Sequence, residues 1–147
     1  MALSIIDLRT KRLPNAIVYP SLAIAASLIL AGDLAGGDLS VASGAIGFLA
    51  YGLGLLIVAV IAPKGMGMGD VKLAALIGLV LGSLGLEYVA VAAGVGILLG
   101  GVGAIVALAL GASRKTALPF GPFLAGGAVV ATFAARPIAD TYLRLLT

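Results

Sequence analysis

Five long runs of apolar residues restrict this chain to a membrane. Free of charge except near their ends, they cover approximately residues 16–32, 41–62, 71–86, 88–112 and 120–135. A lipid bilayer offers the backbone no hydrogen-bond partners, and a helix of about 20 apolar residues crosses its ~30 Å hydrocarbon core. The runs therefore predict an all-α, polytopic transmembrane bundle of about five spanning helices with short termini.

Composition agrees with this fold class. The chain is 62% hydrophobic and 10% charged, whereas soluble domains are about 25% charged. Its 147 residues are enough for this bundle but not for an additional soluble module, so we expect a single transmembrane domain over residues 1–147.

The absence of two residue types excludes several chemistries. The chain has no cysteine and no histidine. Disulfides, thiolate zinc sites, cysteine nucleophiles and serine–histidine triads are therefore excluded. Carboxylates, lysines and hydroxyls remain, and we expect neither a metal ion nor another cofactor.

Basic residues predict the orientation of the bundle. Five spans place the N-terminal segment and the loops near residues 63–70 and 113–119 on one face. Seven of the nine basic residues belong to that face: Arg9, Lys11, Arg12, Lys64, Lys72, Arg114 and Lys115. By the positive-inside rule that face is cytoplasmic. We expect these basic residues to orient the protein and to contact membrane lipid. We expect no nucleic-acid partner.

The acidic residues divide into two groups. Four of them fall in the predicted outer loops or tail, where water hydrates them: Asp33, Asp38, Glu87 and Asp140. Asp7 and Asp70 are the two acids on the predicted cytoplasmic face, each beside apolar helical sequence. Because a charged carboxylate in mid-membrane costs about 2.5–3.5 kcal/mol on insertion scales, this pair requires an explanation.

The segment before Asp70 has an unusual glycine pattern. Gly65, Gly67 and Gly69 alternate with other residues directly before the aspartate. Each glycine costs a helix about 1 kcal/mol relative to alanine, so we expect a pliable loop that leads into the third span. Asp70 then lies on a first helical turn, where the dipole favours a carboxylate. A loop with a capping aspartate, without further function, is the simpler alternative.

Asp7 lies in a basic segment that ends in Leu13-Pro14-Asn15. A juxtamembrane anchor with one neutralised aspartate is the simpler interpretation of this segment. Two aspartates on one face, each at the edge of a span, can nevertheless converge if their helices are neighbours. Paired carboxylates can activate water without a separate nucleophile.

Three motifs in order resemble the type IV prepilin peptidases, which are membrane aspartyl peptidases. They are Asp7 with Leu13-Pro14-Asn15, then Gly67-Met68-Gly69-Asp70, then Leu118-Pro119-Phe120-Gly121-Pro122. The resemblance implies catalytic roles for Asp7 and Asp70. It also implies substrate-binding or loop roles for Gly65, Gly67, Gly69, Lys72, Pro14, Asn15, Pro119 and Gly121.

The resemblance further implies a substrate and a location. The substrate is a prepilin or pseudopilin, cut at the cytoplasmic face of a prokaryotic inner membrane. Bifunctional members carry a paired-cysteine region with methyltransferase activity; this chain has no cysteine, so no methylation is expected. Family members usually have a full helix before the first catalytic aspartate, where this sequence has only residues 1–6. We expect either that this helix is absent or that the sequence is a shortened form.

The expected mechanism is a coupled pair in which Asp7 and Asp70 share one proton and hold a water molecule between them. Two other classes of function stay open. In a small proton or cation transporter or channel subunit, the two aspartates need not meet. An inactive scaffold of a pilus or secretion assembly would retain the motifs without cleavage. The oligomeric state, including a homo-oligomer, also stays open.

Overall fold

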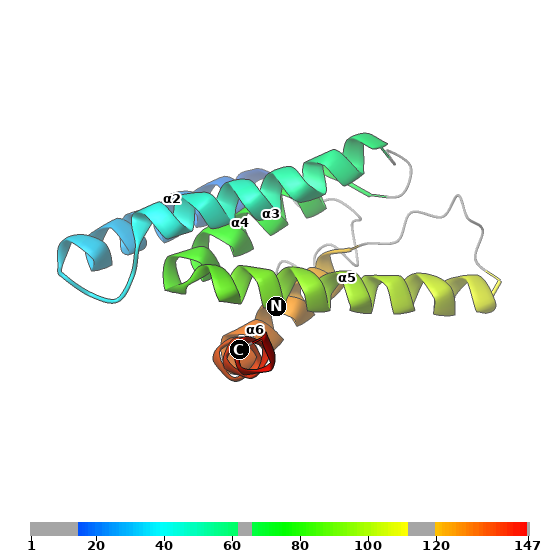
Figure 1. The fold of residues 1–147 in the computed structure, drawn as a ribbon. Helices are drawn as coiled ribbons and strands as arrows, with labels where there is room; N and C mark the ends of the chain where they lie inside the picture. The colour runs from blue at the N-terminus through cyan, green and yellow to red at the C-terminus, as the bar shows by residue number, and fades with distance from the viewer. Residues whose placement is uncertain (1–14, 62–65, 112–119, 147) are drawn as a thin grey trace.

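The computed structural model describes residues 15–61, 66–111 and 120–146. Five helices make up most of these residues (Figure 1): α2 (Asn15–Leu34), α3 (Val41–Ile61), α4 (Met68–Leu84), α5 (Leu86–Ala109) and α6 (Gly121–Leu146). These described ranges contain no strand. The predicted all-α bundle is confirmed.

Four of the described helices are long and apolar enough to cross a membrane, namely α2, α3, α5 and α6. The remaining helix, α4, has 17 residues and so measures about 26 Å, less than the ~30 Å hydrocarbon core. It is also the central helix, because it packs against each of the other four. This position explains why so many of its residues are buried.

Helix α4 begins earlier than predicted. Its first residue is Met68 and not residue 71, and Gly67 precedes it in an extended conformation (φ −81°, ψ 149°). The prediction that Gly69 belongs to a loop is therefore wrong. Burial of the apolar residues Val71, Leu73 and Ala74 in the bundle outweighs the intrinsic cost of about 1 kcal/mol for a helical glycine.

The connection between α4 and α5 consists of Gly85 alone. Its φ of 149° is a value that residues with a Cβ rarely adopt. Its N–H donates to the carbonyls of Leu81 and Gly82, both at 3.1 Å. Glu87 was expected in a loop, but it lies in the first turn of α5, because the turn is shorter than the sequence suggests.

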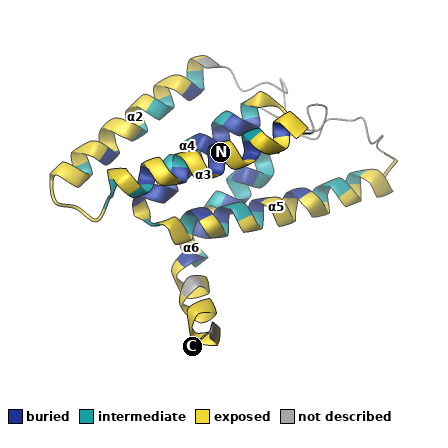
Figure 2. Cartoon of the chain, turned by 45° about the horizontal axis from the view of Figure 1, so that its top comes forward, coloured by how far each residue is buried: buried dark blue, intermediate teal, exposed yellow. Residues whose placement is uncertain are grey.

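Helix α6 is longer than predicted. The expected span over residues 120–135 continues to Leu146, so the expected short tail is the second half of a helix. Pro137 lies inside α6, and the Thr141 hydroxyl donates to the Pro137 carbonyl at 2.7 Å. Figure 2 shows this second half extending away from the other helices, largely exposed.

Glycines bring α3 and α4 into close contact. A Cβ added to Gly78 would collide with the Gly47 carbonyl oxygen and lie 2.8 Å from its carbon. A Cβ on Gly82 would lie 2.7 Å from the Ser43 carbonyl oxygen. Helices in lipid associate through van der Waals packing, which small residues make possible at short range. The two helices therefore form a tightly packed hairpin.

A second hairpin pairs α5 with α6. A Cβ on Gly127 would lie 2.9 Å from the Gly96 nitrogen. Helix α5 has five glycines in this region: Gly94, Gly96, Gly100, Gly101 and Gly103. An added Cβ meets nothing within 4 Å at Gly94 and Gly101. Those two are seven residues apart and share a different face of α5 from the other three.

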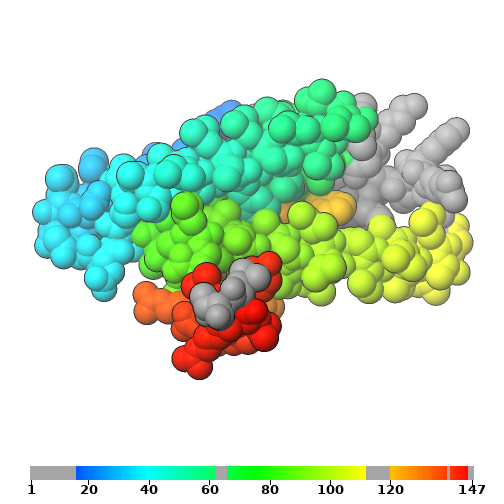
Figure 3. All heavy atoms as spheres, in the orientation of Figure 1, coloured from blue at the N-terminus to red at the C-terminus, as the bar shows by residue number. Residues whose placement is uncertain are grey.

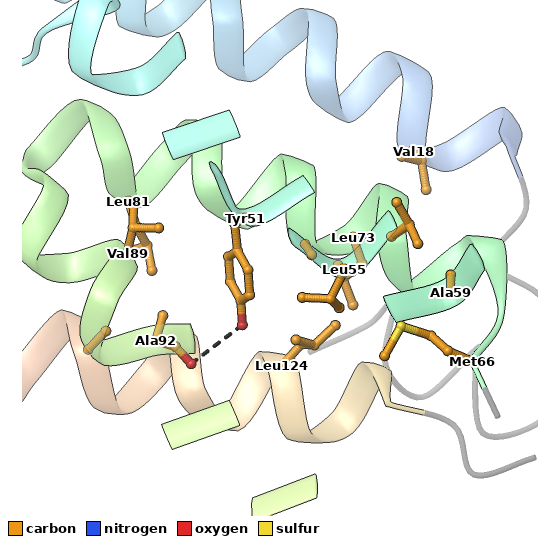
Figure 4. Close-up of a cluster of buried hydrophobic side chains, with 13 residues drawn as sticks. Val18, Tyr51, Leu55, Ala59, Met66, Leu73, Leu81, Val89, Ala92 and Leu124 are labelled. Carbon is orange, nitrogen blue, oxygen red and sulfur yellow. Dashed lines mark hydrogen bonds between the residues drawn. The ribbon is translucent and has the colours of Figure 1, made fainter. Parts of the chain in front are cut away.

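The core joins the two hairpins (Figure 4). Tyr51 of α3, which is 3% exposed, points toward α5, and its hydroxyl donates to the Ala92 carbonyl at 3.4 Å. Leu55 of α3 and Leu124 of α6 lie in the same cluster. The cluster therefore fixes the position of α6 relative to α3 and α4.

Helices α2 to α5 run in alternating directions (Figure 1). As a result, the C-terminal end of α3, the N-terminal end of α4 and the C-terminal end of α5 lie at one end of the bundle. Gly67 and Asp70, at the start of α4, lie at this end.

Candidate active site

Asp70 is a buried carboxylate on the first turn of α4. It is 4% exposed, and its own N–H donates to the Gly67 carbonyl at 3.1 Å. The first N–H groups of a helix have no partners within the helix and carry partial positive charge. Asp70 therefore lies where an ionised carboxylate is stabilised, as predicted from the sequence.

The start of α6 supplies a donor to this carboxylate. The backbone N–H of Phe120 donates to Asp70 Oδ2 at 3.2 Å. The Phe120 carbonyl accepts hydrogen bonds from Phe123 and Leu124, each at 3.0 Å, so Phe120 caps α6. Asp70 consequently lies at the N-terminal ends of two helices, its own and α6, and both dipoles favour the charged form.

The aromatic rings of Phe120 and Phe123 anchor the start of α6 against α5. The Phe120 and Phe123 rings meet edge to face, with centroids 6.0 Å apart. A Cβ on Gly100 would collide with the Phe120 ring, and one on Gly103 would collide with the Phe123 ring. The glycines of α5 thus make room for the rings that position the α6 amide against Asp70.

Lys72 connects α4 with α2. Its Nζ lies 5.2 Å from the centroid of the Tyr19 ring, within the range of a cation–π contact. Tyr19 is 59% exposed, so the amine is directed toward the outer surface of α2. Lys72 therefore lies beside α2, two residues after Asp70.

The structure brings some of the predicted site residues together. Gly67, Gly69 and Asp70 form the start of α4, and Gly121 is the buried first residue of α6, next to Phe120. Asn15 is the first residue of α2. Four of the predicted site residues lie outside the described ranges: Asp7, Pro14, Gly65 and Pro119. The pairing of Asp7 with Asp70 therefore stays a prediction.

Sequence reasoning missed the Phe120 amide. It identified the neighbours Pro119 and Gly121 but assigned no role to the backbone between them. A signal was present, because Pro119 and Pro122 have no N–H. This leaves few donors at the start of α6, and those donors need acceptors. The acceptor, 50 positions away in the sequence, could not be predicted from the pattern.

Comparison with known proteins decides the family. Residues 1–110 match the type IV leader peptidase family. The chain belongs to this family. It is also 31% identical over 103 residues to a protein of Bacillus subtilis (strain 168) described as a prepilin leader peptidase/N-methyltransferase. That similarity covers 70% of this chain and 41% of the relative. No solved structure matches the chain.

Family membership confirms the resemblance drawn from the three motifs. Together with the helices able to cross a bilayer, it identifies the chain as a multi-pass membrane protein of a peptidase family. The matched region contains Asp7 and Asp70 but ends before α6. In this chain, the amide that contacts Asp70 thus comes from the residue before α6, beyond the matched residues.

The described residues contain no cluster of three or more acidic side chains that could hold a metal ion. The arrangement around Asp70 is that of a carboxylate held in one orientation at a helix boundary. Such a group can accept or donate a proton in a reaction at this end of the bundle.

Proposed function

We propose that this chain is an intramembrane aspartyl endopeptidase that removes the leader peptide of prepilin-like substrates. The proposal includes a single transmembrane domain, cleavage at the cytoplasmic face of a prokaryotic inner membrane, and no methyltransferase activity. The observation that supports it best is Asp70, buried at a helix start and bonded to the α6 backbone, in a chain of the leader peptidase family.

In the proposed mechanism Asp7 and Asp70 share one proton. The ionised carboxylate removes a proton from water, whose oxygen attacks the scissile carbonyl carbon. The protonated carboxyl donates to the carbonyl oxygen as negative charge develops there. The carboxyl that took the proton from water passes it to the amide nitrogen, and the C–N bond breaks to yield a carboxylate and an amine. The Phe120 amide contributes by fixing Asp70 Oδ2 in position.

The predicted distribution of basic residues supports the proposed membrane face. In the sequence, seven of the nine basic residues belong to the segment before α2, the segment between α3 and α4, the start of α4, or the segment between α5 and α6. Under the positive-inside rule the end of the bundle at which α4 begins faces the cytoplasm. A substrate with a leader on that side would present its cleavage site to Asp70 while its apolar helix stays within the membrane.

The experiment that tests the proposal compares three variants in proteoliposomes. Asp70→Asn and Asp7→Asn each remove the ability to carry the shared proton while preserving size. We expect each to lower the cleavage rate of a prepilin-like substrate by at least a thousandfold. Asp38→Asn, an exposed position in the α2–α3 connection, is the matched control and should cleave at the wild-type rate. Mass spectrometry of the products measures the rates.

Two outcomes of this experiment would contradict the proposal. Cleavage by Asp70→Asn at the wild-type rate would remove Asp70 from the chemistry. Absence of cleavage by the wild type, combined with an aspartate-dependent proton flux across the same liposomes, would support the transport alternative instead.

A further inference from the structure

An apolar groove runs between α3 and α5. Its volume is about 600 Å³. One wall is α3 from Ile46 to Val58, the other is α5 from Leu86 to Ile97, and Phe120 contributes to the lining from the start of α6. In Figure 3 this start of α6, in orange, is visible between α3 and α5. The groove therefore lies lengthwise along the bundle.

The dimensions of the groove fit a helix. Each wall covers about 12 residues, or ~18 Å, which corresponds to roughly three helical turns. The walls include small residues that face the groove, among them Ala50 and Gly54 on α3 and Ala90 on α5. A Cβ added to Gly54 meets nothing within 4 Å, so this part of the wall is open.

Small residues favour a helix over a lipid chain as the occupant. Burial in protein gives an apolar helix no hydrophobic gain over lipid, so its binding depends on close backbone approach, which small residues permit. A flexible acyl chain has no comparable need for small residues. Tyr51 is the one side chain with a hydroxyl among the described lining residues, and that hydroxyl already donates to Ala92.

The groove is continuous with the candidate active site. Phe120 lines the groove, and its backbone N–H donates to Asp70. Met66, which also lines the groove, lies just before α4. One end of the groove therefore lies at the residue whose amide contacts the carboxylate.

We propose that this groove binds the apolar transmembrane helix of the substrate, with the end of that helix at Phe120. The residues that precede the substrate helix then reach Asp70 in extended form. This inference rests on the proposed function and adds a binding site for the membrane-embedded part of the substrate.

A pair of variants tests the groove. Gly54→Leu places a branched side chain in the groove, and its Cβ meets nothing within 4 Å. Gly101→Leu is the matched control, since Gly101 is also a helical glycine with nothing within 4 Å and does not line the groove. Leucine has a higher helix propensity than glycine at both positions, so neither change should unfold its helix.

Binding is measured first, independently of cleavage. The probe is a synthetic peptide with a basic leader and a 20-residue apolar helix that carries a diazirine, in vesicles of phosphatidylethanolamine and phosphatidylglycerol. Relative to wild type, we expect the cross-linking yield to fall at least fivefold in Gly54→Leu and to change less than twofold in Gly101→Leu. Equal yields in wild type and Gly54→Leu would overturn the proposal, as would cross-linking of a diazirine phospholipid that excess peptide does not reduce.

Cleavage is then compared for this peptide and for a short soluble peptide that contains the leader and cleavage site without the helix. We expect Gly54→Leu to lower the ratio of the two rates, membrane peptide over soluble peptide, at least tenfold. An unchanged ratio would overturn the proposal that the groove binds the substrate helix. Cross-linking that falls in Gly54→Leu, without any cleavage by wild type, would support helix binding in the groove. It would contradict only the proposed peptidase activity.

Discussion

At the scale of single residues, the contact between Asp70 and Phe120 is the most informative feature of the site. A buried carboxylate loses its hydration and must recover hydrogen bonds from the protein. The Phe120 N–H provides one of them at 3.2 Å, and the helix end provides a favourable field. A backbone donor cannot rotate away as a side chain can, so it holds the carboxylate in one orientation.

This contact can be tested by comparing Phe120→Pro with Phe120→Ala. Both remove the ring, but only proline removes the N–H. A hydrogen bond to a charged group contributes about 1.5–3 kcal/mol. We therefore expect kcat for leader cleavage to be roughly tenfold to a hundredfold lower in Phe120→Pro than in Phe120→Ala.

Thermal unfolding in detergent provides the control for this comparison. Only variants with similar unfolding temperatures are compared, so that a lower rate reflects the site and not loss of the fold. Equal kcat values for the proline and alanine variants would show that the amide does not support catalysis.

At the scale of helices, glycine contacts decide which helices pair. Gly47 and Gly78 lie at the α3–α4 contact, and Gly96 and Gly127 lie at the α5–α6 contact. The sequence does not distinguish Gly96, which meets α6, from Gly94, around which the space is open. Only the rotation of α5 about its axis, set by its neighbours, determines which glycines face another helix.

Gly78→Ala tests this packing at the α3–α4 contact. The added Cβ would collide with the Gly47 carbonyl and lie 3.0 Å from the Tyr51 Cβ. Because backbone must shift to relieve the collision, we expect the free energy of unfolding to fall by about 1–3 kcal/mol. Gly101→Ala, with open space around it, should instead be neutral or stabilising by up to about 1 kcal/mol.

Equilibrium unfolding of both variants in mixed micelles measures the difference. A Gly78→Ala variant as stable as Gly101→Ala would mean that the two helices separate easily at this point. The close packing would then not be a major source of stability.

At the scale of the whole molecule, α4 is a short central helix surrounded by the longer ones. It contacts all four other described helices, so the start of α4 is held from several sides. The alternating directions of α2 to α5 bring helix ends together at the side of Asp70 (Figure 1). Precise placement of a carboxylate at a membrane boundary follows from this arrangement.

The orientation of the molecule can be tested with single cysteines, because the sequence contains none. Residue 38 lies in the α2–α3 connection, at the opposite end of the bundle from the start of α4, and Asp38→Cys places a thiol there. We expect a membrane-impermeant maleimide to label it in intact spheroplasts. Lys64→Cys should be labelled only after the membrane is permeabilised, since the positive-inside rule places residue 64 in the cytoplasm. The reverse pattern would invert the proposed topology.

The sequence by itself determined the membrane class, the helices of the bundle and the candidate carboxylates. These depend on local properties: runs of apolar residues, the alternation of charge between loops, and motifs a few residues long. Local propensity also misplaced elements where the surroundings decide the outcome, as with Gly69, which is helical, and residues 136–146, which continue α6.

Only the tertiary structure decided which helices are neighbours, that the start of α6 supplies a donor to Asp70, and that an apolar groove leads to the same place. Each of these features joins backbone atoms or surfaces from distant parts of the chain. A hydrogen bond from a main-chain amide leaves no mark on the identity of its residue. It becomes visible only once packing has brought residues 70 and 120 together.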